Sequence, residues 1–269
     1  MDYFERAKEL KDELISNRRY IHENAEVGME LPNTCHYVVS KLSKMGYEPK
    51  VVGGSGVTAT VGNGHGKTIL LRADMDALPM KEESGEPFAC KSGKAVHACG
   101  HDLHTTMLLG AAKMLKENEA ALEGTVKLVF QPGEEIFKGS KALIEDGILE
   151  SPKVDAALAY HVGPGKMPVG LHMYNDKNTM MYSNDGFKIT VHGKGAHGAY
   201  PHHSIDPIHI AVQIYLGLEE IIAREIDSSS PCVMTIGKLV AGEANNIIPE
   251  TAEIQGSIRT TSVENREIM

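Results

Sequence analysis

Short, almost continuous apolar runs that alternate with helical patterns constrain the fold of this sequence most strongly. Three such runs lie at residues 69–71, 126–130 and 154–160, and the segments between them repeat apolar residues at helical spacing. Strands of this kind are typical of a sheet covered on both faces, and strand–helix alternation favours parallel pairing. The pattern predicts an α/β domain over residues 1–183, with a mixed, largely parallel central sheet and helices on both faces.

The other elements of this domain follow from the same spacing rule. Apolar residues recur at helical spacing over residues 3–21, 34–45 and 104–118, and a shorter helix is expected at 140–146. One further strand is expected at 57–61, ahead of a turn rich in Gly and Asn.

The last third of the sequence changes pattern, because its strands alternate apolar and polar residues. The alternation is clear at 187–191 and 252–258, a strand is expected at 232–240, and a long helix at 208–226. The order β-α-β-β suits a small antiparallel sheet with helices on one side. We expect this α+β segment to be a second domain, over residues 184–269.

The sequence ends soon after another helix signal. Thr261-Ser-Val-Glu264 has the form of a capping box, in which Thr261 would cap a new helix. Met269 follows about a turn and a half later, and a helix that short is marginal alone. The second domain is therefore expected to be incomplete.

Charge and cysteine content narrow the function classes. There are 27 Lys and Arg against 36 Asp and Glu, a formal net charge of −9, which argues against a basic surface for nucleic acid or anionic membrane. No apolar stretch approaches the ~18 residues that span a bilayer, and the charged N-terminal segment does not resemble a secretory signal. Four widely spaced cysteines do not suggest a disulfide framework. We expect a cytoplasmic protein with no nucleic-acid or membrane partner.

Side chains that can bind metal follow each predicted strand of the α/β domain. Because the carboxyl ends of parallel strands meet at one edge of a sheet, these side chains are expected to converge there. Imidazole, thiolate and carboxylate groups together suit Zn²⁺ or a similar divalent ion. The candidates are Asp74 and Asp76 after the first run, Cys99 and His101 before a helix, Glu134 and Glu135 after the second run, and His161 after the third.

The adjacent carboxylates Glu134 and Glu135 suggest a hydrolytic site. One can bind metal while the other accepts a proton from water and passes it to a leaving group. The expected reaction is hydrolysis of an amide, ester or similar bond. Taken singly, Cys99 is typical of a small buried side chain and the Glu pair of an exposed loop, so the prediction depends on convergence. His104 shares a helix face with apolar residues and is expected to be packed, without a bond to metal.

A cysteine nucleophile is the competing interpretation. Cys99 lies close to His101 in the sequence, which permits a thiol–imidazole pair. Residues two apart rarely face each other productively, however, and such a pair would leave Glu134 and Glu135 without a role. The metal site is therefore the preferred interpretation.

Motifs along the whole chain together resemble the M20 family of metallopeptidases. The resemblance is closest to the amidohydrolase subfamily, which includes hippurate hydrolases, N-acyl-amino-acid amidohydrolases, N-acetyldiaminopimelate deacetylases and plant auxin-conjugate hydrolases. It implies a catalytic domain with a di-metal site, and an inserted ferredoxin-like lid domain through which members dimerise. The motifs are RRYIHENAEVGMELPNT, LRADMDALPM, HACGHDLHTTMLLGAAKML, VFQPGEEIFKGSKALIEDGIL, AYHVGP, GKGAHGAYPHHSIDP, and NNIIP followed by GSIRT.

The resemblance implies metal ligands and a proton carrier. Cys99, His101, Glu135 and His161 match four of the family's ligands for two divalent ions. Such ligands accept Zn²⁺ or Mn²⁺, and also Co²⁺ or Ni²⁺. Glu134 matches the family's general base and acid.

Four further residues match supporting or substrate-binding positions. Asp76 matches an aspartate that supports the metal ligands. His197 matches a lid histidine that reaches across a dimer and helps to bind the tetrahedral oxyanion. Asn246 and Arg259 match lid positions associated with the substrate carboxylate, which Arg can bind with two parallel hydrogen bonds.

The implied activity is metal-dependent hydrolysis of N-acyl amino acids to a carboxylic acid and a free amino acid, by a homodimer formed through the lid domain. Family members continue beyond the end of this sequence and supply one more ligand, a histidine. Two alternatives stay open: a fragment that binds metal or dimerises without turnover, and a dipeptidase of the same family.

Overall fold

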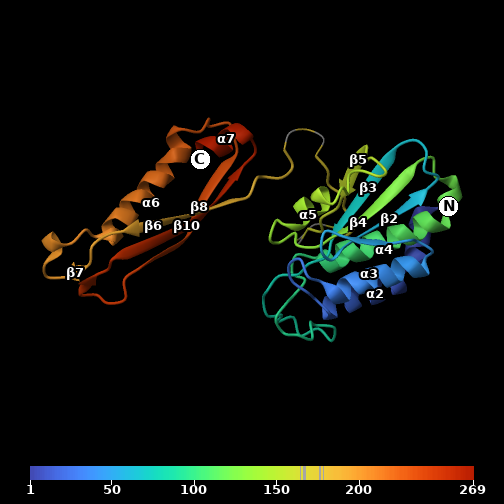
Figure 1. Ribbon diagram of the computed structural model, residues 1–269, viewed down its shortest axis with the longest axis horizontal. Coiled ribbons are helices and arrows are strands. Elements are labelled where there is room, and N and C mark those ends of the chain that lie inside the picture. The colour runs from blue at the N-terminus through green and yellow to red at the C-terminus, as the bar shows by residue number, and fades with distance from the viewer. Residues whose placement is uncertain (164, 166–167, 176, 178) are drawn as a thin grey trace. The chain divides into compact units, whose positions relative to one another are not determined.

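The computed structural model describes residues 1–163, 165, 168–175, 177 and 179–269. Contacts divide the chain into two compact units, residues 1–167 and residues 168–269 (Figure 1), and each unit is described by itself. The predicted domain boundary, between residues 183 and 184, lies just before the first strand of the second unit, whose contacts also include residues 168–183. Their interpretation as a catalytic and a lid domain stays a prediction.

A five-stranded mixed sheet forms the centre of the first unit. Its strands are β1 (Lys50–Val52), β2 (Gly56–Gly62), β3 (Thr68–Asp74), β4 (Thr125–Gln131) and β5 (Ala156–Ala159). They lie in the order β1-β2-β4-β3-β5. β3 pairs in parallel with β4 and β5, whereas β2 pairs antiparallel with β1 and β4. The predicted mixed sheet is confirmed, with parallel pairing in its β4-β3-β5 half.

Helices cover both faces of this sheet, as predicted. They are α1 (Tyr3–Glu9), α2 (Lys11–Glu23), α3 (Pro32–Lys44), α4 (His101–Glu117) and α5 (Gly139–Glu145), with a short 3-10 turn at Glu119–Ala121. Figure 1 shows α2, α3 and α4 side by side against the strands. On the opposite face, Leu143 of α5 packs with Leu70 and Val129.

The single helix predicted over residues 3–21 is in fact two helices. Leu10 separates α1 from α2, and its backbone N–H donates to the Arg6 carbonyl. Leu10 is buried, so the apolar spacing continues through the break. The prediction was wrong here because spacing reports which face is buried and does not report a local interruption of the helix.

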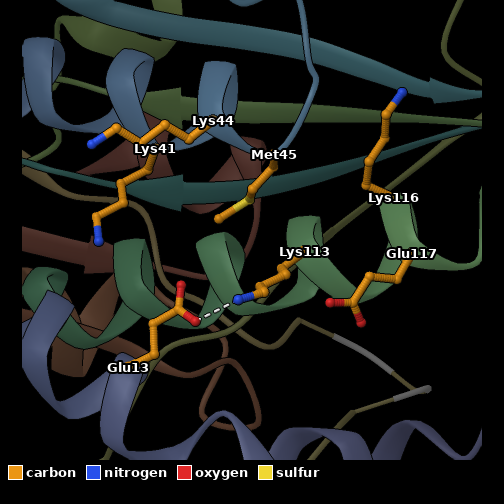
Figure 2. Close-up of a pocket in the computed structure, with 7 residues that line it drawn as sticks. All are labelled: Glu13, Lys41, Lys44, Met45, Lys113, Lys116 and Glu117. Carbon is orange, nitrogen blue, oxygen red and sulfur yellow. Dashed lines mark hydrogen bonds and ion pairs between the residues drawn. The ribbon is translucent and has the colours of Figure 1, made fainter.

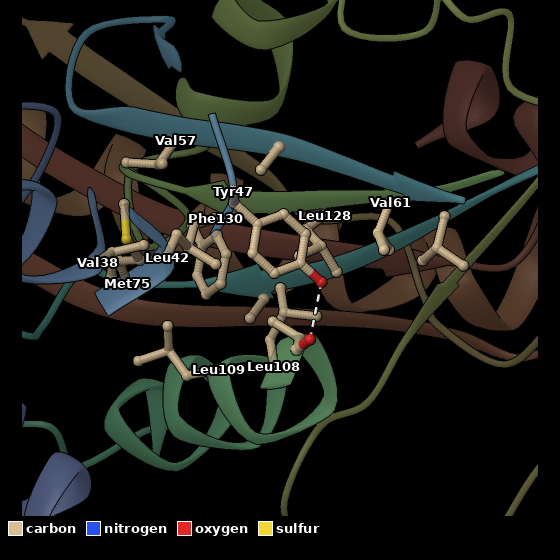
Figure 3. Close-up of a cluster of buried hydrophobic side chains, with 14 of the residues drawn as sticks. Val38, Leu42, Tyr47, Val57, Val61, Met75, Leu108, Leu109, Leu128 and Phe130 are labelled. Carbon is tan, nitrogen blue, oxygen red and sulfur yellow. Dashed lines mark hydrogen bonds between the residues drawn. The ribbon is translucent and has the colours of Figure 1, made fainter. Parts of the chain in front are cut away.

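The main hydrophobic core lies between the sheet and helices α3 and α4 (Figure 3). Its members include Val57, Val61, Leu128 and Phe130 from the strands and Val38, Leu42, Leu108 and Leu109 from the helices. β4 is buried along its whole length, as predicted for a strand covered on both faces. Burial of each large apolar side chain contributes about 1.5–3 kcal/mol. This core fixes the place where the carboxyl ends of β3 and β4 emerge.

β5 corrects one expectation from the sequence. Its run Ala156–Ala159 was expected to be covered on both faces, but all four residues are exposed. β5 is the edge strand of the described sheet and pairs with β3 alone. A continuous apolar run predicts a strand, but it does not show whether other elements pack against both faces of that strand.

A three-stranded antiparallel sheet forms the second unit, as predicted. Its strands are β6 (Asp185–His192), β8 (Cys232–Ala241) and β10 (Thr251–Thr260), in the order β6-β10-β8. The long helix α6 (Pro207–Arg224) packs its Ala211 against Val191, Ala252 and Ile254 of the sheet. Two short strands, β7 (Ala196–His197) and β9 (Ile247–Ile248), pair separately, and a 3-10 turn lies at Pro201–His203.

The last helix, α7 (Val263–Ile268), begins one residue later than its sequence signal suggested. Ser262 is the cap, because its side chain accepts the backbone N–H of Asn265 at 3.1 Å. The prediction of Thr261 as the cap was therefore wrong by one position. Of all the helices in the described residues, none is long and apolar enough to cross a membrane.

Candidate metal centre

The carboxyl ends of β3, β4 and β5 open onto one edge of the sheet. Asp74 is paired in register with Gln131, and Arg72 with Ala159, so the segments that follow these strands leave side by side. α4 begins at the same edge, with His101 as its first residue. Metal-capable side chains form three groups whose ligand atoms lie within 4.8 Å of one another: Cys99, His101 and His161; Asp74, His101 and His104; and His101, Glu134 and Glu135.

His101 belongs to all three groups and is fully buried. Its Nδ1 lies 2.7 Å from the Asp76 carbonyl oxygen and donates to it, which leaves Nε2 as the side that can bind metal. Nε2 lies 3.8 Å from Glu135 Oε1, and neither atom has a hydrogen-bond partner in the part of the chain that the structure describes. Buried polar atoms without partners are rare and costly. A divalent cation between these two atoms would satisfy both.

Two opposing effects act on the pKa of His101. Burial lowers it, whereas the carboxylates of Asp76 and Asp74 raise it, and the net result is a pKa above the usual value. The metal-free imidazole therefore holds a proton more readily than an ordinary histidine. That proton must leave before Nε2 can bind metal.

Cys99 and His161 form the other half of the candidate centre. Cys99 Sγ lies 3.3 Å from His161 Nε2, while His161 Nδ1 donates to the Val162 carbonyl at 2.8 Å. Burial, together with the carboxylates of Glu135 and Glu134, raises the pKa of Cys99 to about 12. Such a thiol is a poor nucleophile, which argues against the thiol–imidazole alternative. It can still bind metal with loss of its proton.

Asp76 holds the two glutamates in place. Its buried carboxylate accepts the backbone N–H groups of Glu134, at 2.9 Å, and Glu135, at 3.1 Å. Glu134 Oε2 then lies 3.9 Å from His101 Nε2. Burial raises the pKa of Glu134 above its usual value, although the side chain is still partly open to solvent. A carboxylate with these properties can accept a proton and return it.

Asp74 has partners that the sequence did not reveal. Its Oδ1 lies 2.6 Å from His104 Nδ1, and its Oδ2 pairs with Arg72 Nη1 at 2.7 Å. Arg72 also donates to Gln131 at 3.0 Å. His104 is buried, as expected, and it accepts the backbone N–H of Val162 at 2.9 Å. Asp74 thus connects β3 to α4 and to the segment after β5, which no linear motif indicates.

A buried ionic network fixes the first turn of α4. Asp102 accepts from Arg18 Nε at 2.7 Å and lies 2.8 Å from His22 Nδ1, and His22 Nε2 lies 3.0 Å from Glu82. The Asp102 hydrogen bond and the nearby Glu82 raise the pKa of His22 against the effect of burial. This network joins α2, α4 and the loop before Cys99. It holds Asp102, the residue that follows His101, and so supports the position of His101.

In the second unit, His197 and Asn246 lie together. β7 and β9 pair His197 with Ile247, and the Asn246 carbonyl accepts the backbone N–H of Gly198 at 2.8 Å. The His197 ring is exposed, and its Nδ1 accepts the N–H of Ala199 at 3.1 Å. The two residues therefore lie on adjacent segments at the paired strands β7 and β9, a region called here the β7–β9 turn.

Arg259 lies far from that turn within the same unit. The turn joins the sheet at the start of β10, at Thr251, whereas Arg259 is opposite Val233 near the end of the strand. Eight residues of extended chain separate the two positions by roughly 27 Å. Arg259 lines a shallow groove with Met181 and Tyr182, and its buried Nη1 has no hydrogen-bond partner among the described residues.

A separate groove between α2, α3 and α4 has the wrong chemistry for a cation (Figure 2). Four lysines line it, and Glu13 from α2 points towards Lys113 from α4, 2.5 Å away. Ammonium groups repel metal ions, so this groove does not compete with the centre at the strand ends. The lining is Glu13, Lys41, Lys44, Met45, Lys113, Lys116 and Glu117.

Comparison with known proteins agrees with this arrangement. A thermostable carboxypeptidase from Saccharolobus solfataricus is 43% identical over 260 residues, covering 94% of this chain and 65% of that protein. An N-acetyl-L-cysteine deacetylase from Bacillus subtilis is 39% identical over 261 residues, covering 96% of this chain and 61% of that protein. A crystal structure of a dinuclear metal-binding peptidase of the M20 family, also from Bacillus subtilis, matches with a TM-score of 0.76 and 35% identity, covering 97% of this chain and 67% of that one.

The chain thus spans 61–65% of the length of these two curated relatives. The sequence model of peptidase family M20/M25/M40 matches residues 70–254, which contain every residue of the candidate metal centre. The chain therefore belongs to peptidase family M20/M25/M40, and its relatives agree with the amidohydrolase subfamily.

Proposed function

We propose that this chain carries the metal centre of an amidohydrolase that cleaves N-acyl amino acids to a carboxylic acid and a free amino acid. One observation carries the proposal: His101 Nε2 and Glu135 Oε1 are buried, face each other at 3.8 Å and lack hydrogen-bond partners among the described residues, beside the partly exposed Glu134. The names of relatives, including an N-acetyl-L-cysteine deacetylase, support the choice of substrate class.

Cys99, His101, Glu135 and His161 would hold two divalent ions. Their sulfur, nitrogen and oxygen donors fit Zn²⁺ or Mn²⁺, and also Co²⁺ or Ni²⁺. Bound there, the ions would supply Lewis acidity, which polarises an amide carbonyl and lowers the pKa of water. The two histidines each direct Nδ1 at a backbone carbonyl, so both keep Nε2 for this purpose.

Glu134 would move the proton. Its raised pKa allows it to take a proton from the attacking water and then to give that proton to the departing amine. The two backbone N–H groups bound by Asp76 fix the segment that places the Glu134 carboxylate 3.9 Å from His101 Nε2.

The second unit would bind the substrate, through His197 at the oxyanion and through Asn246 and Arg259 at the carboxylate. Because Arg259 lies roughly 27 Å along β10 from the turn that carries the other two, one small substrate cannot touch all three in one copy. This separation supports a homodimer in which the two copies contribute different residues to each site.

The four cysteines are all free thiols, which suits the cytoplasm.

A peptidase acting on unblocked peptides is the second candidate, because one relative is named a carboxypeptidase.

To test the proposed function, the chain is loaded with Mn²⁺ or Zn²⁺, free metal is removed and bound ions are counted by elemental analysis. Amino acid release is then measured from N-acetyl and N-benzoyl amino acids and from dipeptides. We expect two ions and release from the N-acyl substrates. Faster release from dipeptides would favour the second candidate, and retained ions without any turnover would favour a chain that binds metal only.

A further inference from the structure

His104 lies beside the candidate centre and has no place in the proposed chemistry. It is 2% exposed. The backbone N–H of Val162 donates to its Nε2 at 2.9 Å, so this nitrogen is an acceptor and the ring hydrogen lies on Nδ1. Nδ1 then donates to Asp74 Oδ1 at 2.6 Å. Both ring nitrogens are engaged, and His104 could bind metal only by giving up a buried hydrogen bond.

The backbone of Val162 connects His104 to His161 through the two peptide groups on either side of its Cα. Its N–H is bound by His104, and its carbonyl accepts from His161 Nδ1 at 2.8 Å. Its side chain packs against the backbone at the start of α4, where a Cβ on Gly100 would come within 2.4 Å of Val162 Cγ2. Val162 is thus held by α4 on one side and holds the His161 ring on the other.

The Val162 carbonyl decides which nitrogen of His161 can bind metal. His161 is exposed, and its Nδ1–H bond to Val162 leaves the Nε2 lone pair directed at Cys99 Sγ, 3.3 Å away. The His161 and His104 rings also meet in an edge-to-face arrangement, with centroids 4.6 Å apart. If the Val162 backbone moved and its carbonyl turned away, His161 would lose both its orientation and its fixed tautomer.

We propose that Asp74 and His104 are positioning residues for His161: they fix the backbone of Val162, and the Val162 carbonyl in turn fixes the ring and tautomer of the ligand. The inference rests on the proposed function, since it takes His161 to be a metal ligand. It also gives Asp74 and His104 a role without a bond to metal, although both lie close enough to His101 to be mistaken for ligands.

Two substitutions of His104 separate its two hydrogen bonds. In His104→Asn the amide nitrogen replaces Nδ1 and keeps the bond to Asp74, but nothing accepts from Val162. In His104→Gln the amide oxygen replaces Nε2 and keeps the bond from Val162. We expect His104→Asn to weaken Zn²⁺ binding about tenfold, and His104→Gln to bind within about threefold of the wild type, as measured by competition with a chelating dye. In a His161→Ala background, the Asn and Gln variants should bind alike. Equal loss in both variants, no loss in either, or an unchanged Asn effect in the His161→Ala background would each overturn the proposal.

A second readout uses the metal-free chain and separates this inference from the proposed function. Long-range ¹H–¹⁵N NMR spectra report which nitrogen of His161 carries the hydrogen. We expect the Nδ1–H tautomer in the wild type and in His104→Gln, and a mixture in His104→Asn. A failure of the wild type to retain metal would contradict the proposed function, while the tautomers would still decide whether His104 positions His161. The same tautomer in all three proteins would overturn the inference even if metal binds.

Discussion

The candidate residues of the two units are held in opposite ways. In the first unit His101 is fully buried and bonded to a backbone carbonyl, and Asp76 binds two neighbouring N–H groups. In the second unit the His197 ring is exposed and accepts the backbone N–H of Ala199, two residues away in the sequence. The first arrangement holds the candidate ligands through buried hydrogen bonds and leaves His101 Nε2 and Glu135 Oε1 without partners among the described residues, as a metal site held in place before binding requires. The second arrangement leaves side chains open to bind a substrate or a second copy of the chain.

The largest expected effect is the loss of turnover when the proton carrier of the first unit, Glu134, is replaced. Glu134→Gln keeps the shape and the backbone N–H bond to Asp76 but cannot accept a proton. Turnover of an N-acyl amino acid should fall about 10²–10⁴-fold, with the number of bound ions unchanged. Glu145→Gln, at an exposed position on α5, is the matched control and should keep full activity. Retained turnover in the Glu134 variant would contradict the role given to this residue.

The next largest effect is a loss of metal affinity when Asp76 is replaced, which tests whether the first unit is organised before metal binds. Asp76→Ala removes the acceptor for two backbone N–H groups and should weaken metal binding about 10–100-fold. Asp76→Asn retains one acceptor oxygen and should lie between the alanine variant and the wild type. His197→Ala, in the second unit, should leave metal affinity within about twofold. Titration calorimetry measures all three, and an equal loss for Asp76→Ala and His197→Ala would remove the contrast between the units.

Metal binding should also depend on pH in a stated direction. Cys99, with a pKa of about 12, holds its proton near neutral pH and must release it to metal, and the raised pKa of His101 makes its imidazole keep a proton more readily than an ordinary histidine. Affinity should rise about tenfold per pH unit for each proton released. Cys99→Ser should flatten this slope, as measured by chelator competition between about pH 6 and 8. A slope independent of Cys99 would mean that the thiol is not a ligand.

The smallest expected effect is a difference between the two units in the stability that each loses in acid. In the first unit the pKa of Asp102 is lowered by His22 and the pKa of Glu82 is lowered to about 2, so their ionised forms stabilise the fold above the unfolded pKa values. That stability should be lost as the pH falls from about 4.5 to about 2. In the second unit, Lys188 and Lys238 lower the pKa of Glu253 to about 2, but this group is on the surface.

Salt should separate these two cases. Surface pairs are screened by added salt and buried ones much less. Hydrogen exchange measured by mass spectrometry at pH 3, with and without 0.5 M NaCl as an approximate screening condition, reports each unit separately. We expect salt to remove the acid effect around Glu253 and to preserve it around Asp102. An equal response in both units would show that the network at Asp102 is open to solvent.

Much of the fold could be predicted because it depends on local patterns. The strands at β3 and β4 and the helix α6 follow from spacing, and their pairing follows from strand–helix alternation. The break at Leu10, the cap at Ser262 and the exposure of β5 could not be predicted. Each depends on a single backbone interaction or on neighbours distant in sequence, which a local pattern does not contain.

The candidate site shows the same division. Cys99, His101, Glu134 and Glu135 could be found because metal-capable side chains follow strands whose ends meet at one edge. Their supports could not be found in this way. The bonds from Asp74 to His104 and from Val162 to His104 join segments about 30 and 58 positions apart, so only the folded chain reveals them.

The most direct test of the metal centre is the absorption spectrum of the Co²⁺-loaded chain. A thiolate bonded to Co²⁺ gives a charge-transfer band in the near ultraviolet, and binding at Cys99 should produce it. Cys90→Ala, at a buried cysteine outside the centre, should keep the band, whereas Cys99→Ser should lose it. A wild-type chain that retains Co²⁺ without this band, or a Cys99→Ser variant that keeps it, would contradict a centre built on Cys99, His101, Glu135 and His161.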